Sequence, residues 1–156
     1  MKILAVDTSG PVAGVAVLRD GALAYEATAV NKMTHSVNMM PMVEEALNKS
    51  STLISDIDLY ATVTGPGSFT GVRIGVSAAK GFAWGAELPV YGVSTLQAMA
   101  LGLGTWEGHI CCCMDARRNQ VYNAVFLAEE GKLTRICEDR AISLAELKTE
   151  LEQVRQ

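Results

Sequence analysis

The stretch Gly65–Gly71 (Gly-Pro-Gly-Ser-Phe-Thr-Gly) constrains this chain most, because it separates two segments of different character. Before it, residues 57–63 form a short apolar run that is typical of a buried strand. After it, residues 71–84 combine small and apolar residues in a helix-like run. A strand, a glycine loop and a helix leave free backbone N–H groups that point at an anion. The stretch therefore predicts an α/β fold with a loop similar to a phosphate site.

The length and composition of the chain suit one domain or two small ones. It has 156 residues, of which 49% are apolar and 19% charged, so it can bury a core. No apolar run reaches the length of a membrane span. The apolar part of residues 1–7 is too short for a signal peptide, and Asp7 interrupts it. We therefore expect a cytoplasmic protein that does not cross a membrane.

The charged residues argue against nucleic-acid binding by this chain alone. The formal net charge is −4, and the largest basic cluster is the pair Arg117-Arg118. Affinity for nucleic acid comes mostly from neutralising phosphates, which needs more basic residues than this.

Three of the four cysteines, Cys111, Cys112 and Cys113, are consecutive within an apolar run, and the fourth is Cys137. Neighbouring strand residues point to opposite faces, so adjacent cysteines are poorly placed to chelate one ion. We expect these cysteines to be small apolar residues of a buried strand, without a metal site.

The same order of predicted strands occurs twice along the chain. In the first copy the strands are residues 2–7, 12–19 and 22–30. In the second copy the strands are residues 109–114, 120–127 and 132–137. Matching positions Asp7 and Asp115 lie 108 residues apart, and Gly21 and Gly131 lie 110 apart. Both glycines belong to Asp-Gly or Glu-Gly hairpin signals. The repeat indicates duplication of one unit.

The first copy continues after its strands, whereas the second is shorter. The first copy adds a helix at 36–50, a strand at 57–63, a helix at 71–84 and a strand at 89–93. We expect Ser36 to cap the first helix, Ser68 or Thr70 the second, and Ser94 or Thr95 a third. The second copy has a helix from Ser143, with Glu146 completing a capping box.

The second copy lacks counterparts of residues 57–93. We therefore expect a first domain at 1–105 and an incomplete second domain at 106–156, as in a truncated chain, a clipped protein or an unusually short relative.

This tandem plan resembles the actin-like ATPase (ribonuclease H-like) fold, which has a mixed five-stranded sheet with helices. Three stretches are similar to the TsaB (YeaZ) family: residues 3–9, 65–75 and 115–122, with Gly92-Val93-Ser94-Thr95-Leu96 between the last two. The resemblance covers residues 1 to about 128.

The resemblance implies a part in making N6-threonylcarbamoyladenosine at position 37 of tRNA. In this family the chemistry belongs to TsaD, and TsaB is its non-catalytic scaffold or activator, joined by the ATPase TsaE. The resemblance also implies a homodimer in isolation and access to tRNA only through the complex. No cofactor is then required, although a weak ATP or ADP contact is implied at the interface with TsaD.

The residues at the two nucleotide motifs depart from those of an ATPase. Asp7, Thr8 and Ser9 stand where actin-like ATPases carry Asp-x-Gly, so we expect either a structural turn or a weak, residual nucleotide site. The glycine loop lacks the Lys and Ser/Thr that follow the last Gly of a Walker loop. A small-molecule kinase or ATPase of the actin-like fold stays open as the alternative.

Peptidase and metal chemistry have weaker signals. Ser68 is flanked by Pro66 and Thr70 instead of the two glycines of a nucleophile elbow, which leaves a peptidase as the last alternative. His35 is followed four residues later by Met39, so no second histidine shares its helical face. We expect no metal ligand there.

The two helices after the meander are the predicted partner surface. Residues 36–50 have a broad apolar face, with Met39, Met40 and Met42 close together. Gly71, Gly75 and Ala79 recur every four residues, which suits close approach of another helix or of the chain's own sheet.

In the TsaB family these two helices dock against a second subunit. The resulting interface candidates are Met39, Met40, Val43, Leu47, Ile74, Ala78 and Phe82. On this basis Val43→Glu is expected to weaken TsaD binding without disturbing the fold.

Overall fold

The computed structural model describes residues 1–30 and 35–154. These residues form two compact units, Met1–Val93 and Ser94–Gln156, and each is described by itself.

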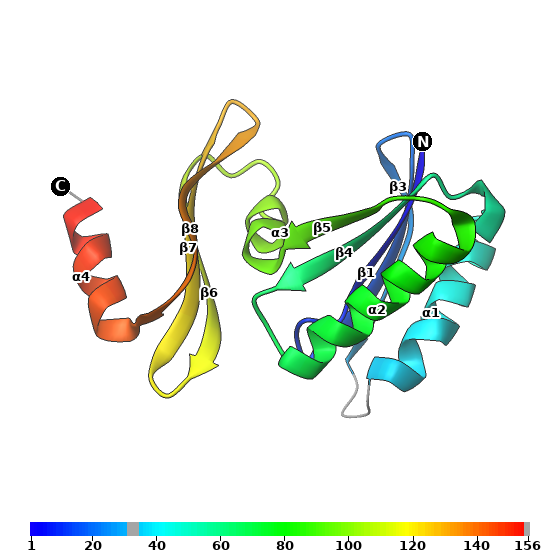
Figure 1. The fold of residues 1–156 in the computed structure, drawn as a ribbon. Helices are drawn as coiled ribbons and strands as arrows, with labels where there is room; N and C mark the ends of the chain where they lie inside the picture. Colours follow the sequence, from blue (N-terminus) through cyan, green and yellow to red (C-terminus); the bar gives the residue numbers. More distant parts are fainter. Residues whose placement is uncertain (31–34, 155–156) are drawn as a thin grey trace. The chain divides into compact units, whose positions relative to one another are not determined.

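The first unit is a mixed sheet with two helices packed on one face (Figure 1). Its strands are β1 (Lys2–Asp7), β2 (Val12–Arg19), β3 (Ala22–Val30), β4 (Leu59–Gly65) and β5 (Val90–Ser94). Its helices are α1 (His35–Lys49), the short 3-10 helix η1 (Ile54–Asp56) and α2 (Phe69–Ala86). The sheet order is β3-β2-β1-β4-β5, with β1 antiparallel to β2 and parallel to β4. The predicted actin-like meander and five-stranded mixed sheet are confirmed.

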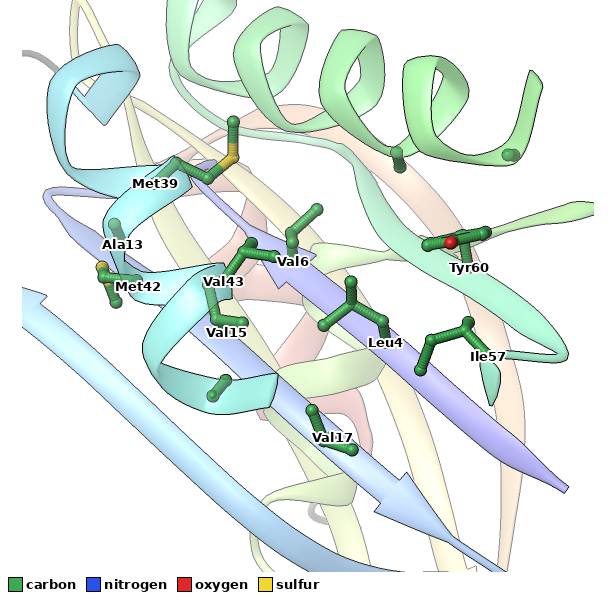
Figure 2. Packing of buried hydrophobic residues seen from close by; sticks show 13 residues of the cluster. Leu4, Val6, Ala13, Val15, Val17, Met39, Met42, Val43, Ile57 and Tyr60 are labelled. Atoms are coloured by element: carbon green, nitrogen blue, oxygen red, sulfur yellow. The ribbon is translucent and has the colours of Figure 1, made fainter. Parts of the chain in front are cut away.

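The core of this unit follows the two periodicities of its sequence. Alternate residues of the central strands point to the helix-covered face, and residues three and four apart on α1 meet them. The buried members are Leu4, Val6, Ala13, Val15, Val17, Met39, Met42, Val43 and Ala46. Figure 2 shows Val43 of α1 beside Val6 and Val15 of the sheet. Removing this apolar area from water fixes α1 on the sheet.

The predicted boundaries of the first unit differ by one or two residues at α1, β4, α2 and β5. The helix already includes His35, so Ser36 lies within the first turn and the prediction that Ser36 caps it is wrong. The His35 Nε2 lies 2.8 Å from the Gly10 carbonyl oxygen, which joins the helix start to the turn after β1.

The second unit is an antiparallel meander with a helix at each end of its sequence. Its elements are α3 (Thr95–Leu101), β6 (Gly108–Arg117), β7 (Gln120–Glu129), β8 (Lys132–Ser143) and α4 (Leu144–Val154). One face of the sheet packs against Leu96 and Ala100 of α3. Because α3 contacts β6, β7 and β8, this unit begins at Ser94, earlier than residue 106. The Ser94 side chain accepts the N–H of Gln97, so Ser94 is the cap of α3.

The cysteines of β6 divide between the two faces of this sheet. Cys112 is buried against α3 with Ile110, as predicted. Cys111 and Cys113 are exposed, and Cys137 on β8 is half-buried, so the prediction of a wholly buried cysteine run is wrong. The strand alternation used to exclude chelation by neighbours also places Cys111 and Cys113 on one face.

Among the residues that the structure describes, no helix combines the length and apolar character needed to cross a membrane.

The capping box of α4 is confirmed and gives the first testable prediction. The Ser143 Oγ accepts the N–H of Glu146 at 3.2 Å, and the Glu146 carboxylate accepts the N–H of Ser143 at 3.1 Å. We expect Ser143→Ala to remove about 1 kcal/mol of helix stability, because one N-terminal N–H loses its acceptor. Amide hydrogen exchange across α4 measures this, with Thr149→Ala on the same helix as the control. Equal exchange rates in the two variants would contradict it.

The box is also pH-dependent in a definite direction. The hydrogen bonds from Ser143 lower the pKa of Glu146 below its ordinary value. A carboxyl with a lowered pKa in the folded state adds stability above its unfolded pKa and loses it as the pH falls. Amide exchange in α4 of the unchanged chain should therefore accelerate below about pH 4. This acceleration should be larger than that in Ser143→Ala over the same pH range.

Candidate functional site

The turn after β1 is buried beneath the start of α2. Thr8 and Ser9 are 1% and 2% exposed, and the Asp7 carboxylate accepts the N–H of Ser9 at 2.7 Å. The Thr8 hydroxyl donates to the Gly71 carbonyl at 2.7 Å. The N–H of Ser68 donates to the Ser9 carbonyl, also at 2.7 Å. The glycine loop and the Asp7–Ser9 turn therefore bind each other directly.

Ser68 forms the N-terminal cap of α2. Its Oγ accepts the N–H of Gly71 at 3.2 Å, and its carbonyl accepts the N–H of Val72 at 2.8 Å. Of the two predicted caps, Ser68 and Thr70, the structure selects Ser68. The hydroxyl considered as a peptidase nucleophile thus holds the helix start.

Three glycines of this region lie where a side chain has no room. A Cβ at Gly71 would stand 2.0 Å from the Thr8 carbonyl oxygen, and one at Gly67 would stand 2.5 Å from the Ser9 carbonyl oxygen. At Gly75 it would stand 2.7 Å from the Thr8 hydroxyl oxygen. Glycine has no Cβ, so at these positions α2 can lie directly against the chain's own backbone.

The small-residue stripe of α2 therefore faces its own sheet. Its buried members are Gly71, Gly75, Ala79 and Ala83. Of the two interpretations of this spacing, packing on the sheet is confirmed, and the stripe is not a surface for another helix.

The predicted interface residues fall into three groups by solvent exposure. Met39 and Val43 are 4% and 3% exposed and belong to the core, so the expectation that Val43→Glu leaves the fold intact is wrong. The half-buried residues that pack against this core are Leu47, Ile74, Ala78 and Phe82. Met40 alone of the predicted set is strongly exposed, at 51%. An interface role for these residues stays a prediction.

A second set of apolar side chains points outward from the same two helices. Val37 and Met40 are exposed on α1, and Phe69 and Trp84 on α2, with Trp84 87% exposed. The Arg73 guanidinium lies 3.8 Å from the centre of the Phe69 ring, a cation–π contact. We name these five residues the outer helix face. Phe69 and Trp84 were not among the predicted interface residues, although the spacing 69, 73, 80 and 84 places them on one side of a helix.

The fold defines the class of the protein first: an α/β chain of the actin-like ATPase type. A family model described as "TsaD: tRNA N6-adenosine threonylcarbamoyltransferase" matches residues 29–154. The chain is 38% identical over 146 residues to the "tRNA threonylcarbamoyladenosine biosynthesis protein TsaB" of Bacillus subtilis, and 41% identical over 133 residues to its Escherichia coli namesake. The solved structure "YeaZ from Pseudomonas aeruginosa" is similar with a TM-score of 0.82 at 29% identity. The chain belongs to the TsaB (YeaZ) family of TsaD-like proteins.

These similarities cover the relatives only in part. The matches take in 94% of this chain and 64% of the B. subtilis protein, and 84% of this chain and 57% of the E. coli protein. For the P. aeruginosa structure they take in 90% of this chain and 67% of that chain. The chain therefore spans roughly three fifths of the length of the curated relatives.

The contact between Gly71 and Thr8 gives the second prediction. We expect Gly71→Ala to lower the free energy of unfolding by about 3 kcal/mol or more, because the new Cβ overlaps the Thr8 carbonyl. Urea unfolding followed by far-UV circular dichroism measures the loss.

Gly81→Ala is the matched control on the same helix, since Gly81 is exposed and a Cβ there meets nothing within 4 Å. This variant should gain about 1 kcal/mol from helix propensity. A Gly71→Ala protein as stable as the Gly81→Ala protein would contradict the steric account.

Proposed function

We propose that this chain is a scaffold subunit, without an active site of its own, in the synthesis of N6-threonylcarbamoyladenosine at position 37 of tRNA. It binds TsaD and, together with TsaD, TsaE, and it meets tRNA only through that complex. The names of its relatives support the pathway.

The contact between the glycine loop and the Asp7–Ser9 turn carries this proposal. A phosphate loop uses its glycines and N–H groups for the close approach of phosphate. Here the N–H of Ser68 and that of Gly71 are bonded within the protein, and the space beside Gly71 is taken by the Thr8 carbonyl. Such a loop supports a structural role, and the transfer chemistry then falls to a partner.

The outer helix face supports a role in binding proteins. Trp, Met and Arg side chains are enriched at the centres of protein interfaces. Trp84 and Met40 offer such side chains, and Arg73 adds a planar donor group. In our proposal the same face forms a homodimer in isolation, and TsaD replaces the second copy.

No contact in this region supports the kinase or ATPase alternative or the peptidase alternative. A kinase or ATPase needs a loop that accepts phosphate, and a peptidase needs a free nucleophile, whereas the Ser68 Oγ accepts the N–H of Gly71. We retain one nucleotide contact in the proposal: weak binding of ATP or ADP near Asp7, Thr8 and Ser9 in the presence of TsaD.

The outer helix face gives the third prediction. We expect Trp84→Ala and Met40→Glu each to weaken TsaD binding by about 2 kcal/mol, roughly 30-fold, because exposed aromatic and Met side chains become buried only in the complex. Calorimetric titration of TsaD measures the affinity, and circular dichroism confirms an unchanged fold.

Leu23→Glu is the matched control, since Leu23 is an exposed apolar residue on the edge strand β3. It should bind TsaD normally. Val43→Glu should instead unfold the first unit, because it buries an unpaired charge in the core. Normal TsaD affinity in both Trp84→Ala and Met40→Glu would refute the assigned surface.

The nucleotide site gives the fourth prediction. The isolated chain should bind Mg-ATP weakly and show no turnover, because the N–H groups of Ser68 and Gly71 are already bonded and the Thr8 carbonyl fills the space beside Gly71. Calorimetry and a phosphate-release assay measure the two quantities. Tight binding with turnover would favour the kinase or ATPase alternative.

A further inference from the structure

Two thiols of the second unit lie together on one face of its sheet. Cys111 and Cys113 alternate along β6, and their Sγ atoms are 3.7 Å apart. Both residues are exposed, whereas Cys112 between them is buried on the opposite face. The pair is therefore open to solvent and spaced for one ion to reach both sulfurs.

A buried amide points its donors at this pair. Asn123 lies opposite Cys113 on β7 and is 0% exposed. Its Nδ2 lies 3.3 Å from the Cys111 Sγ and 3.7 Å from the Cys113 Sγ, and it donates to the Cys112 carbonyl at 3.0 Å. The Asn123 amide thus has donors in reach of both sulfurs.

The orientation of that amide is fixed from its other side. The Arg140 Nη2 and Nε donate to the Asn123 Oδ1 at 3.3 and 3.4 Å. A guanidinium has only donors, so the amide oxygen must face Arg140 and the NH2 group must face the sulfurs. Arg140 is held in turn by Glu150 of α4. The site therefore has a positioned donor group and a cation beside two thiols.

The Cys111 thiol lies in an environment that favours its protonated form. Desolvation and the neighbouring Cys113 raise the pKa of the Cys111 thiol to about 11. Reactivity toward oxidants follows the thiolate, so Cys111 is a poor nucleophile at neutral pH. A metal ion changes this, because a coordinating thiol loses its proton to the solvent.

We propose that Cys111 and Cys113 form a two-sulfur site for a soft metal ion, and specifically for Cu(I). Soft sulfur ligands select Cu(I), and two sulfurs fall short of the four ligands of a structural zinc site. Across residues 1–30 and 35–154, no three His, Cys, Asp or Glu side chains gather as a metal group, which favours a low-coordinate ion.

The binding step balances without an electron transfer. Two S–H bonds break, two Cu–S bonds form and two protons leave, so the monovalent ion and two thiolates make a complex of charge −1. The Asn123 amide stabilises that charge, and Arg140 holds the amide in place. The proposal is independent of the role in tRNA modification.

Anaerobic titration of the reduced 156-residue chain with Cu(I), in competition with a chromophoric Cu(I) chelator, tests the site. We expect one tightly bound ion per chain and release of two protons. Cys111→Ser and Cys113→Ser should each lose at least 100-fold in affinity, with unchanged circular dichroism, since both positions are exposed.

Cys137→Ser is the matched control, and it should bind as tightly as the unchanged chain. Asn123→Ala should weaken binding roughly 10-fold through loss of the positioned amide, with circular dichroism as the check on its fold. Retained affinity in Cys111→Ser or Cys113→Ser, or equal loss in Cys137→Ser, would overturn the two-sulfur assignment. Stronger competition by Zn(II) than by Cu(I) would overturn the choice of ion.

Discussion

The packing of α2 onto the turn after β1 is the contact on which the first unit depends. It holds the helix start against Thr8 and Ser9, which are buried, and it requires glycine at 67, 71 and 75. The hydrogen bonds across this contact satisfy the buried Thr8 hydroxyl and the Ser68 N–H, as buried polar groups demand. The Ser68 N–H and the space beside Gly71 are therefore both occupied from within the protein.

Packing on the sheet also decides which side chains of the two helices face solvent. With the small side of α2 against the sheet, its bulky residues Phe69 and Trp84 must point to solvent. On α1 the stripe that contains Met39 and Val43 is taken by the core, which leaves Met40 exposed. Each helix therefore has one buried face that stabilises the fold and one exposed side on which single large apolar residues stand among polar ones.

Sequence patterns predicted the first three strands well, because hairpin signals and alternation are local, whereas β6 and β8 run past their predicted ends at 114 and 137 to Arg117 and Ser143. The bounds of β1, β2 and β3 agree with those predicted, and the capping box at Ser143 and Glu146 is formed. Helix faces were predicted less well. A broad apolar face does not reveal which stripe the sheet will cover, so Val43 could not be placed in the core from its spacing alone.

The sequence by itself determined the fold class, the family and the absence of a Walker lysine after Gly71, since these follow from residue types and their order. Only the tertiary structure decided what the glycines approach, which helix residues stay exposed and which polar groups lie against the thiols of β6. Those outcomes depend on contacts between different segments of the chain, such as Thr8 with the distant Gly71 and Asn123 with Arg140 of the next strand. Local patterns limit such contacts, and packing selects among them.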